Sequence, residues 1–128
     1  MRAIERLTLI YNANAGLWSA IVDSARKALD LKACTLCTIT HGLAGERDEW
    51  RRCSAGLNVP IEYLHRDELP SELSALAGGR LPCVVADAGG ERSVLAGPDD
   101  LAACAGSPEA LERALRERAA AAGLAFPE

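Results

Sequence analysis

The sequence has few aromatic residues, no excess of basic charge and no long apolar segment. Aromatic side chains are 4% of its 128 residues, so we expect an aliphatic core with Trp18 and Trp50 as its largest members. The formal net charge is −4, and basic side chains are interspersed with acidic ones, which argues against a nucleic-acid partner. The apolar run at residues 7–11 is too short for an export signal or a membrane span, so we expect no membrane association and a cytoplasmic location.

The sequence also lacks the usual signatures of several enzyme classes. No Ser-His-Asp spacing, nucleophile elbow or pair of carboxylates on one face is recognisable. No interdomain linker or internal repeat interrupts the chain, and its length suits one hydrophobic core. We therefore expect a single domain over residues 1–128.

Five cysteines are present, and their odd number excludes a disulfide framework that uses all of them. Without an export signal, reduced thiols are expected. Cys53, Cys83 and Cys104 each stand alone in an apolar or helical context, where cysteine usually packs as a small hydrophobic residue. Cys34 and Cys37 form a Cys-x-x-Cys pair and are considered below.

The hydrophobic pattern predicts an alternation of strands and helices. Apolar β-forming runs and alternation predict strands at residues 7–11 and 59–64, and a hairpin at residues 81–96 that turns at Gly89-Gly90. Helical spacing predicts helices at residues 17–29, 46–55 and 70–77, a short turn at residues 101–104 and a closing helix from Ser107. Asn14 is a candidate cap for the first helix, and Asp99 or Asp100 for the short turn. Residues 32–45 fit either a strand or an irregular helix.

This order of elements resembles that of the thioredoxin and glutaredoxin superfamily over nearly the whole chain. The resemblance implies an α/β, thioredoxin-like fold with a central mixed sheet of about four strands flanked by helices, and a helical insertion after the first helix. In that superfamily a proline that opens the third strand is commonly cis and faces the loop after the first strand. Pro82 takes that position here, so the resemblance implies a cis Leu81–Pro82 bond.

The sequence departs from the superfamily at the usual place of the redox dithiol. Residues 12–16, which include Asn12 and Asn14, stand between the first strand and first helix, where the superfamily carries its cysteines. The chain is also similar to small uncharacterised bacterial proteins that combine a Tyr-Asn-Ala strand end, a Cys-x-Leu-Cys segment and a His-Arg-Asp-Glu run. Some of these are labelled GTPase, but this chain has no Gly-x-x-x-x-Gly-Lys-[Ser/Thr] phosphate loop.

Cys34 and Cys37 are the main candidates for chemistry. Two thiols three positions apart can close a small disulfide, with Cys34 as the attacking thiol and Cys37 as the resolving one if Cys34 begins a helical turn. If the segment is a regular strand, the two side chains point to opposite faces and the hypothesis weakens. An alternative without chemistry is that both residues simply pack against the first helix. The redox hypothesis requires an unidentified protein partner with a thiol or disulfide.

A zinc site is the second hypothesis for the same cysteines. Cys34, Cys37 and His41 would supply three ligands, and His65 or Cys53 the fourth. No second Cys-x-x-Cys and no His-x₃₋₅-His pair supports it. Apart from possible zinc, no cofactor is expected.

His65 and Asp67 follow the second predicted strand, at the end where open α/β sheets commonly bind ligands. They are candidates for binding or proton transfer, and exposed polar residues without a role are the alternative. A further hypothesis is a non-enzymatic scaffold that binds a protein or small ligand through Asn12, Asn14, Pro82, His65 and Asp67.

Overall fold

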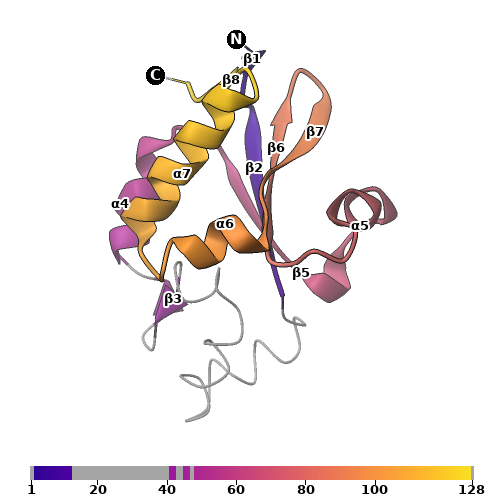
Figure 1. Ribbon diagram of the computed structural model, residues 1–128, viewed down its shortest axis with the longest axis horizontal. Helices are drawn as coiled ribbons and strands as arrows, with labels where there is room; N and C mark the ends of the chain where they lie inside the picture. The colour runs from indigo at the N-terminus through magenta and orange to yellow at the C-terminus, as the bar shows by residue number, and fades with distance from the viewer. Residues whose placement is uncertain (1, 13–40, 43–44, 47, 128) are drawn as a thin grey trace.

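A mixed four-strand sheet forms the centre of the described part of the protein. The structure, a computed structural model, describes residues 2–12, 41–42, 45–46 and 48–127. The four strands are β2 (Arg6–Tyr11), β5 (Ile61–His65), β6 (Cys83–Ala88) and β7 (Glu91–Ala96). Their order across the sheet is β5-β2-β6-β7, with β2 parallel to β5 and antiparallel to β6 (Figure 1). The predicted mixed α/β class is confirmed.

Helices cover both faces of this sheet. The described helices are α4 (Asp48–Gly56), α5 (Ser71–Ala77), α6 (Pro98–Ala103) and α7 (Pro108–Ala121), with a short 3-10 turn, η1 (Arg66–Glu68), after β5. α4 and α7 pack together on one side of the sheet, and α5 lies on the other (Figure 1).

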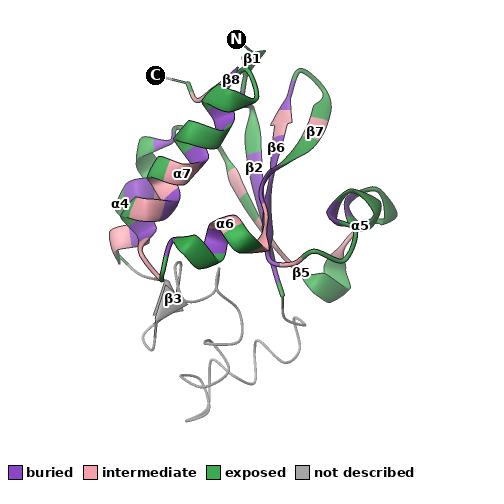
Figure 2. Ribbon diagram, viewed as in Figure 1, coloured by how far each residue is buried: buried purple, intermediate pink, exposed green. Residues whose placement is uncertain are grey.

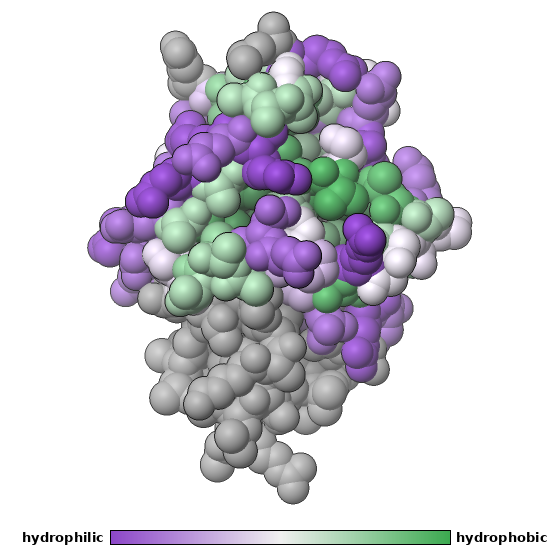
Figure 3. All heavy atoms as spheres, in the orientation of Figure 1, coloured by the Kyte–Doolittle hydropathy of each residue, from purple (hydrophilic) through white to green (hydrophobic). Residues whose placement is uncertain are grey.

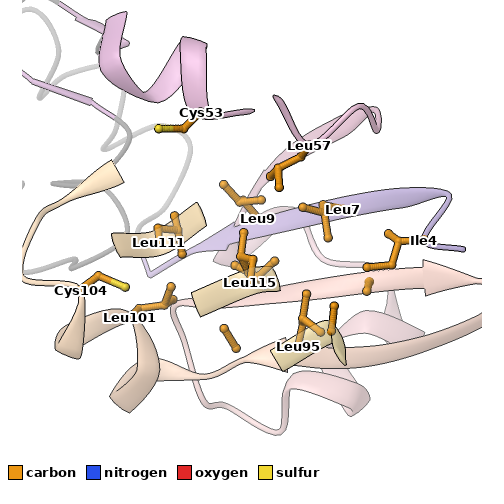
Figure 4. Close-up of a cluster of buried hydrophobic side chains, with 14 of the residues drawn as sticks. Ile4, Leu7, Leu9, Cys53, Leu57, Leu95, Leu101, Cys104, Leu111 and Leu115 are labelled. Atoms are coloured by element: carbon orange, nitrogen blue, oxygen red, sulfur yellow. The ribbon is translucent and has the colours of Figure 1, made fainter. Parts of the chain in front are cut away.

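Alternation along β2 divides its side chains between the two faces. Leu7, Leu9 and Tyr11 are buried toward α4 and α7, where they join the larger core cluster with Leu111 and Leu115 (Figures 2 and 4). Ile10 points the other way, into a smaller cluster beneath α5. Burial of each such aliphatic side chain stabilises the fold by about 1.5 to 3 kcal/mol.

The predicted strands and hairpin are largely confirmed. β5 begins at Ile61 rather than at residue 59, because Pro60 has no N–H to donate and instead accepts a hydrogen bond from Leu7 N at 3.0 Å. β6 and β7 are joined by Gly89 and Gly90, whose φ angles of 59° and 82° suit a tight hairpin turn. The Leu81–Pro82 peptide bond is cis, as the superfamily resemblance implied.

The helix boundaries include one correction. Ser107 caps α7 as predicted, since its side chain accepts a hydrogen bond from Ala110 N at 3.2 Å and Pro108 follows. The prediction that Asp99 or Asp100 caps the next shorter helix is wrong, because α6 begins one position after Gly97. Asp100 lies inside the first turn and accepts from Gly97 N at 3.0 Å, where its negative charge faces the positive end of the helix.

A further pairing was not predicted from the sequence. β1 (Arg2–Ala3) runs parallel to β8 (Leu124–Ala125), which brings the two ends of the described chain together (Figure 1). Ile4 N extends the pairing by donating to Ala125 O at 2.8 Å. Two-residue strands are too short to show a hydrophobic period, so the pattern carried no signal for them.

Several predictions fall on residues that the structure does not describe. The undescribed residues include the predicted helix at residues 17–29 with Trp18, its candidate cap Asn14, and the segment that holds Cys34 and Cys37. β3 (His41–Gly42) pairs antiparallel with β4 (Gly45–Glu46), so the helix predicted from residue 46 starts later, at Asp48. Within the described residues, no helix is both long and apolar enough to cross a membrane.

Candidate functional site

The fold brings together chain segments from three strands at one edge of the sheet. β2 and β5 are parallel and end side by side, with Tyr11 paired to His65. β6 is antiparallel to β2 and begins with Cys83 opposite Ile10, so Pro82 reaches the same edge. We call this part of the molecule the carboxyl edge, because two parallel strands end there. Such an edge is where open α/β sheets commonly hold their ligands.

His65 and Glu68 form a tight polar pair at the carboxyl edge. The imidazole Nδ1 lies 2.6 Å from Glu68 Oε1, and the backbone N–H of His65 donates to the same oxygen at 2.8 Å. These two hydrogen bonds, the side-chain one first, hold the pKa of Glu68 below its ordinary value. The His65 side chain is 17% exposed and that of Glu68 42%, so the ring is largely sheltered while the carboxylate meets solvent.

Aromatic rings support this pair from within the core. Tyr11 is buried, and its ring centroid lies 5.7 Å from the imidazole of His65 at a tilt of 41°. The Tyr11 ring also stacks with the ring of Tyr63 on the neighbouring strand β5, at 6.2 Å between centroids. Tyr63 in turn accepts a hydrogen bond from the buried Trp50 Nε1 at 3.0 Å. The position of His65 is thus set by a continuous series of rings that begins on α4.

Asn12 and Arg66 connect the two strand ends on the solvent side. Arg66 Nη1 lies 3.5 Å from Asn12 Oδ1, a long hydrogen bond between exposed side chains. Asp67 is exposed in the same 3-10 turn. The ends of β2 and β5 therefore place hydrogen-bond donors and acceptors, and side chains of both charges, close together.

Four of the residues predicted as site residues lie at the carboxyl edge: Asn12, His65, Asp67 and Pro82. Cys34, Cys37 and Asn14 lie outside the described residues, and only the backbone of His41 is described, in β3. Among the described residues, no group of three or more His, Cys, Asp or Glu side chains is arranged to hold a metal ion.

The sequence reasoning missed Glu68, Tyr11 and Tyr63 as parts of this edge. The spacing of His65 and Glu68 was a usable signal, since residues three positions apart around a turn can bond reciprocally. The role of the two tyrosines depends on the register of β2 against β5, which no local pattern in the sequence specifies.

Comparison with known proteins identifies no relative. The chain matches no protein-family model, and it has no significant match among curated proteins or solved structures. Any assignment of function has to be argued from the residues themselves.

The described cysteines are poor candidates for thiol chemistry. Cys53, Cys83 and Cys104 are free and buried, as predicted. Burial raises the pKa of Cys83 to about 11, and it also raises the pKa values of Cys53 and Cys104, with help from Glu112 and Asp100 respectively. A raised pKa disfavours the thiolate form on which thiol reactivity depends.

A charged cleft of about 490 Å³ lies between α4 and α7, and none of its lining residues belongs to the carboxyl edge. Acidic and basic side chains line it together, among them Glu112 and Arg116. Arg116 Nη2 lies 3.2 Å from Glu112 Oε2 and donates to Gly56 O at 3.0 Å. These groups bind one another and join the two helices, so the cleft has a structural explanation.

Proposed function

We propose that the protein is a thioredoxin-like domain that takes part in thiol–disulfide exchange, with Cys34 as the attacking thiol and Cys37 as the resolving thiol. The observation that carries the proposal is the strand order β5-β2-β6-β7, with one parallel and two antiparallel pairings. It agrees with the central mixed sheet of about four strands that the resemblance to the superfamily implies. Pro82 lies beside the end of β2 at the carboxyl edge, where that superfamily has its functional proline.

The properties of the other cysteines support the choice of Cys34 and Cys37. Nucleophilic exchange requires a thiolate, and burial raises the pKa of each of the three described thiols. None of those three is therefore suited to attack at neutral pH. Of the five cysteines, only Cys34 and Cys37 are left, and they stand at the spacing of a dithiol.

The proposed reaction is a two-step exchange with a partner disulfide. The Cys34 thiolate attacks one sulfur of the partner disulfide, forms a mixed disulfide and releases the first partner thiolate. The Cys37 thiolate then attacks the Cys34 sulfur, closes the Cys34–Cys37 disulfide and releases the second partner thiolate. The partner gains two electrons and this chain loses them; two molecules of a small thiol reductant, which are oxidised to their disulfide, then restore the Cys34–Cys37 dithiol.

The polar groups of the carboxyl edge would serve to bind the partner. Asn12, His65, Arg66 and Asp67 provide both donors and acceptors for an extended backbone or a polar ligand. The same arrangement favours the second candidate function, a thioredoxin-like scaffold that binds a protein or small ligand without redox chemistry. In that case Cys34 and Cys37 only pack.

A thiol titration distinguishes these functions. We would count reactive thiols in native protein before and after mild oxidation, in the wild type and in Cys34→Ser, Cys37→Ser and Cys53→Ser variants, and measure bound zinc. Redox function predicts that two thiols disappear and return with reductant, that Cys34→Ser or Cys37→Ser abolishes the change, and that the control Cys53→Ser retains it.

Other results would refute the redox proposal. An unchanged thiol count without metal would leave the binding scaffold. Stoichiometric zinc, with thiols that react only after chelation, would establish instead a metal site that uses Cys34 and Cys37.

A further inference from the structure

β7 is the outer strand of the sheet on the side opposite β5. Among the described residues no strand lies beyond it. The pair Ala88 and Glu91 flanks the two-residue turn, so it is hydrogen-bonded and the pairs along the hairpin alternate from there. The backbone N–H and C=O groups of Arg92 and Val94 therefore point away from β6. Such an open edge is able to pair with another strand.

Two large apolar side chains are exposed next to this edge. Val94 is 40% exposed and Leu76 36%, and they are the exposed large hydrophobic residues of the described chain. Both line a groove of about 290 Å³ that is bounded by α5, β7 and the start of α6. Figure 3 shows hydrophobic surface in this part of the molecule, surrounded by hydrophilic side chains. Apolar surface rimmed by polar groups is typical of an interaction site.

The open part of the edge is short. Arg118 Nε donates to Leu95 O at 3.2 Å, and its Nη2 lies 3.8 Å from Asp100 Oδ2, so this side chain covers the last part of β7. The exposed backbone is thereby limited to the region of Arg92 and Val94. Any strand that adds here can form only a few hydrogen bonds, which restricts the possible registers.

We propose that this edge binds the β7 strand of a second copy of the protein, in an antiparallel arrangement with Ser93 on the two-fold axis. This register sets Arg92 opposite the partner's Val94, and the reciprocal pair gives a second set of backbone hydrogen bonds. The small side chain of Ser93 then meets the partner's Ser93 where the strands approach most closely. The two four-strand sheets become one continuous sheet.

The charges around the edge suit a second copy. Arg92 Nε already lies 2.9 Å from Asp87 Oδ1, so the two copies of Arg92 are each neutralised by their own chain. Registers with Arg92 on the axis would place two guanidinium groups opposite each other, which disfavours them. The groove is lined by Arg80 and Arg118 and also by Asp99 and Asp100, so it carries charges of both signs. The same groove on a second copy is therefore not repelled by an excess of one charge.

The first test is the mass of the protein in solution. We expect sedimentation equilibrium to show a reversible monomer–dimer equilibrium, with dimer detectable at a protein concentration of about 0.1 mM. Val94→Lys should weaken the dimer at least about tenfold, because it places a second positive charge opposite the partner's Arg92. Ala55→Lys, at an exposed position on α4, should leave it unchanged. A wild-type monomer, or a dimer that Val94→Lys does not weaken, would overturn the proposal.

The second test is the register. A Ser93→Cys variant, made in a Cys34→Ser and Cys37→Ser background, should form a covalent dimer on mild oxidation, because residues facing each other across such an axis meet the geometry of a disulfide. Ala55→Cys in the same background should not. Circular dichroism checks that each variant is folded. A folded Ser93→Cys protein that dimerises without forming this cross-link would overturn the proposed register.

Discussion

The two ends of the central sheet are constructed differently. At the end that holds the hairpin turn, backbone groups pair with one another: β1 lies along β8, and Glu5 N donates to Asp87 O at 2.7 Å. At the carboxyl edge, the strands end in side chains that carry an imidazole, carboxylates, an amide and a guanidinium. One end joins the termini of the described chain, and the other presents functional groups to solvent.

We infer that residues near the start of β2 act mainly in stability, whereas residues just after its end act mainly in binding or chemistry. β2 runs between the two ends, so a change near its start and a change just after its end should affect different properties. The variants below test that separation, beginning with the largest expected effect on the free energy of unfolding.

Ile4→Ala should cause the largest loss of stability. Ile4 connects β1 to β2 in the sequence, and its side chain is buried in the main core cluster. The substitution therefore leaves a cavity and should lower the free energy of unfolding by about 2 to 5 kcal/mol. Urea denaturation measures it. Asn12→Ala, at the other end of β2, is the matched control and should stay within about 0.5 kcal/mol of the wild type. Equal effects of the two substitutions would contradict the separation.

Tyr63→Phe should have an intermediate effect. It removes the hydroxyl that accepts from Trp50 Nε1, and Trp50 is fully buried, so its N–H would lose this partner away from water. The expected cost is about 1 to 3 kcal/mol. Chemical denaturation followed by tryptophan fluorescence reports it. No loss of stability would mean that the rings behind His65 do not depend on this hydrogen bond.

Ser107→Ala should cost about 1 kcal/mol, because it removes the side chain that caps α7. Thermal unfolding of this variant, compared with Ser54→Ala on α4, gives the difference. The Ser54 hydroxyl donates to Arg51 O of its own helix, and in the described part of the chain it caps no helix start. A larger loss in Ser54→Ala would refute the role assigned to Ser107.

Glu68→Gln should have the smallest effect, and the effect should depend on pH. The pKa of Glu68 is lowered in the folded protein, so its carboxylate stabilises the fold above its ordinary pKa of 4.5, and this contribution is lost as the pH falls through the lowered value. Unfolding curves for wild type and variant should therefore converge in acid and separate near neutral pH. A difference that does not change with pH would exclude the pairing with His65 as its cause.

The parts of the fold that the sequence predicted are those with a strong local pattern. β2 and the β6–β7 hairpin have apolar runs or a Gly-Gly turn, and α7 has a serine cap followed by proline. β1 and β8 have only two residues each and depend on contacts between distant parts of the chain. The start of α6 was misplaced because Asp100 acts from inside the first turn, while Gly97 is the N-cap and Pro98 the first helical residue.

The candidate site was predictable to a similar extent. His65 and Asp67 were predicted because they follow the second predicted strand, and Pro82 because the superfamily resemblance implied a functional position for it. Tyr11 looked like an ordinary end of an apolar strand. Its contact with His65 arises only when β2 and β5 align in parallel, which depends on the whole fold.

The most direct test of the account is to map the disulfide bonds of the oxidised wild-type protein. The protein would be equilibrated in glutathione buffers of increasing redox potential, alkylated, digested and analysed by mass spectrometry. We predict one reversible couple, with Cys34 linked to Cys37 and with Cys53, Cys83 and Cys104 alkylated only after unfolding. Cys34 and Cys37 that stay reduced across the whole range, or that link to other cysteines, would contradict the proposed function.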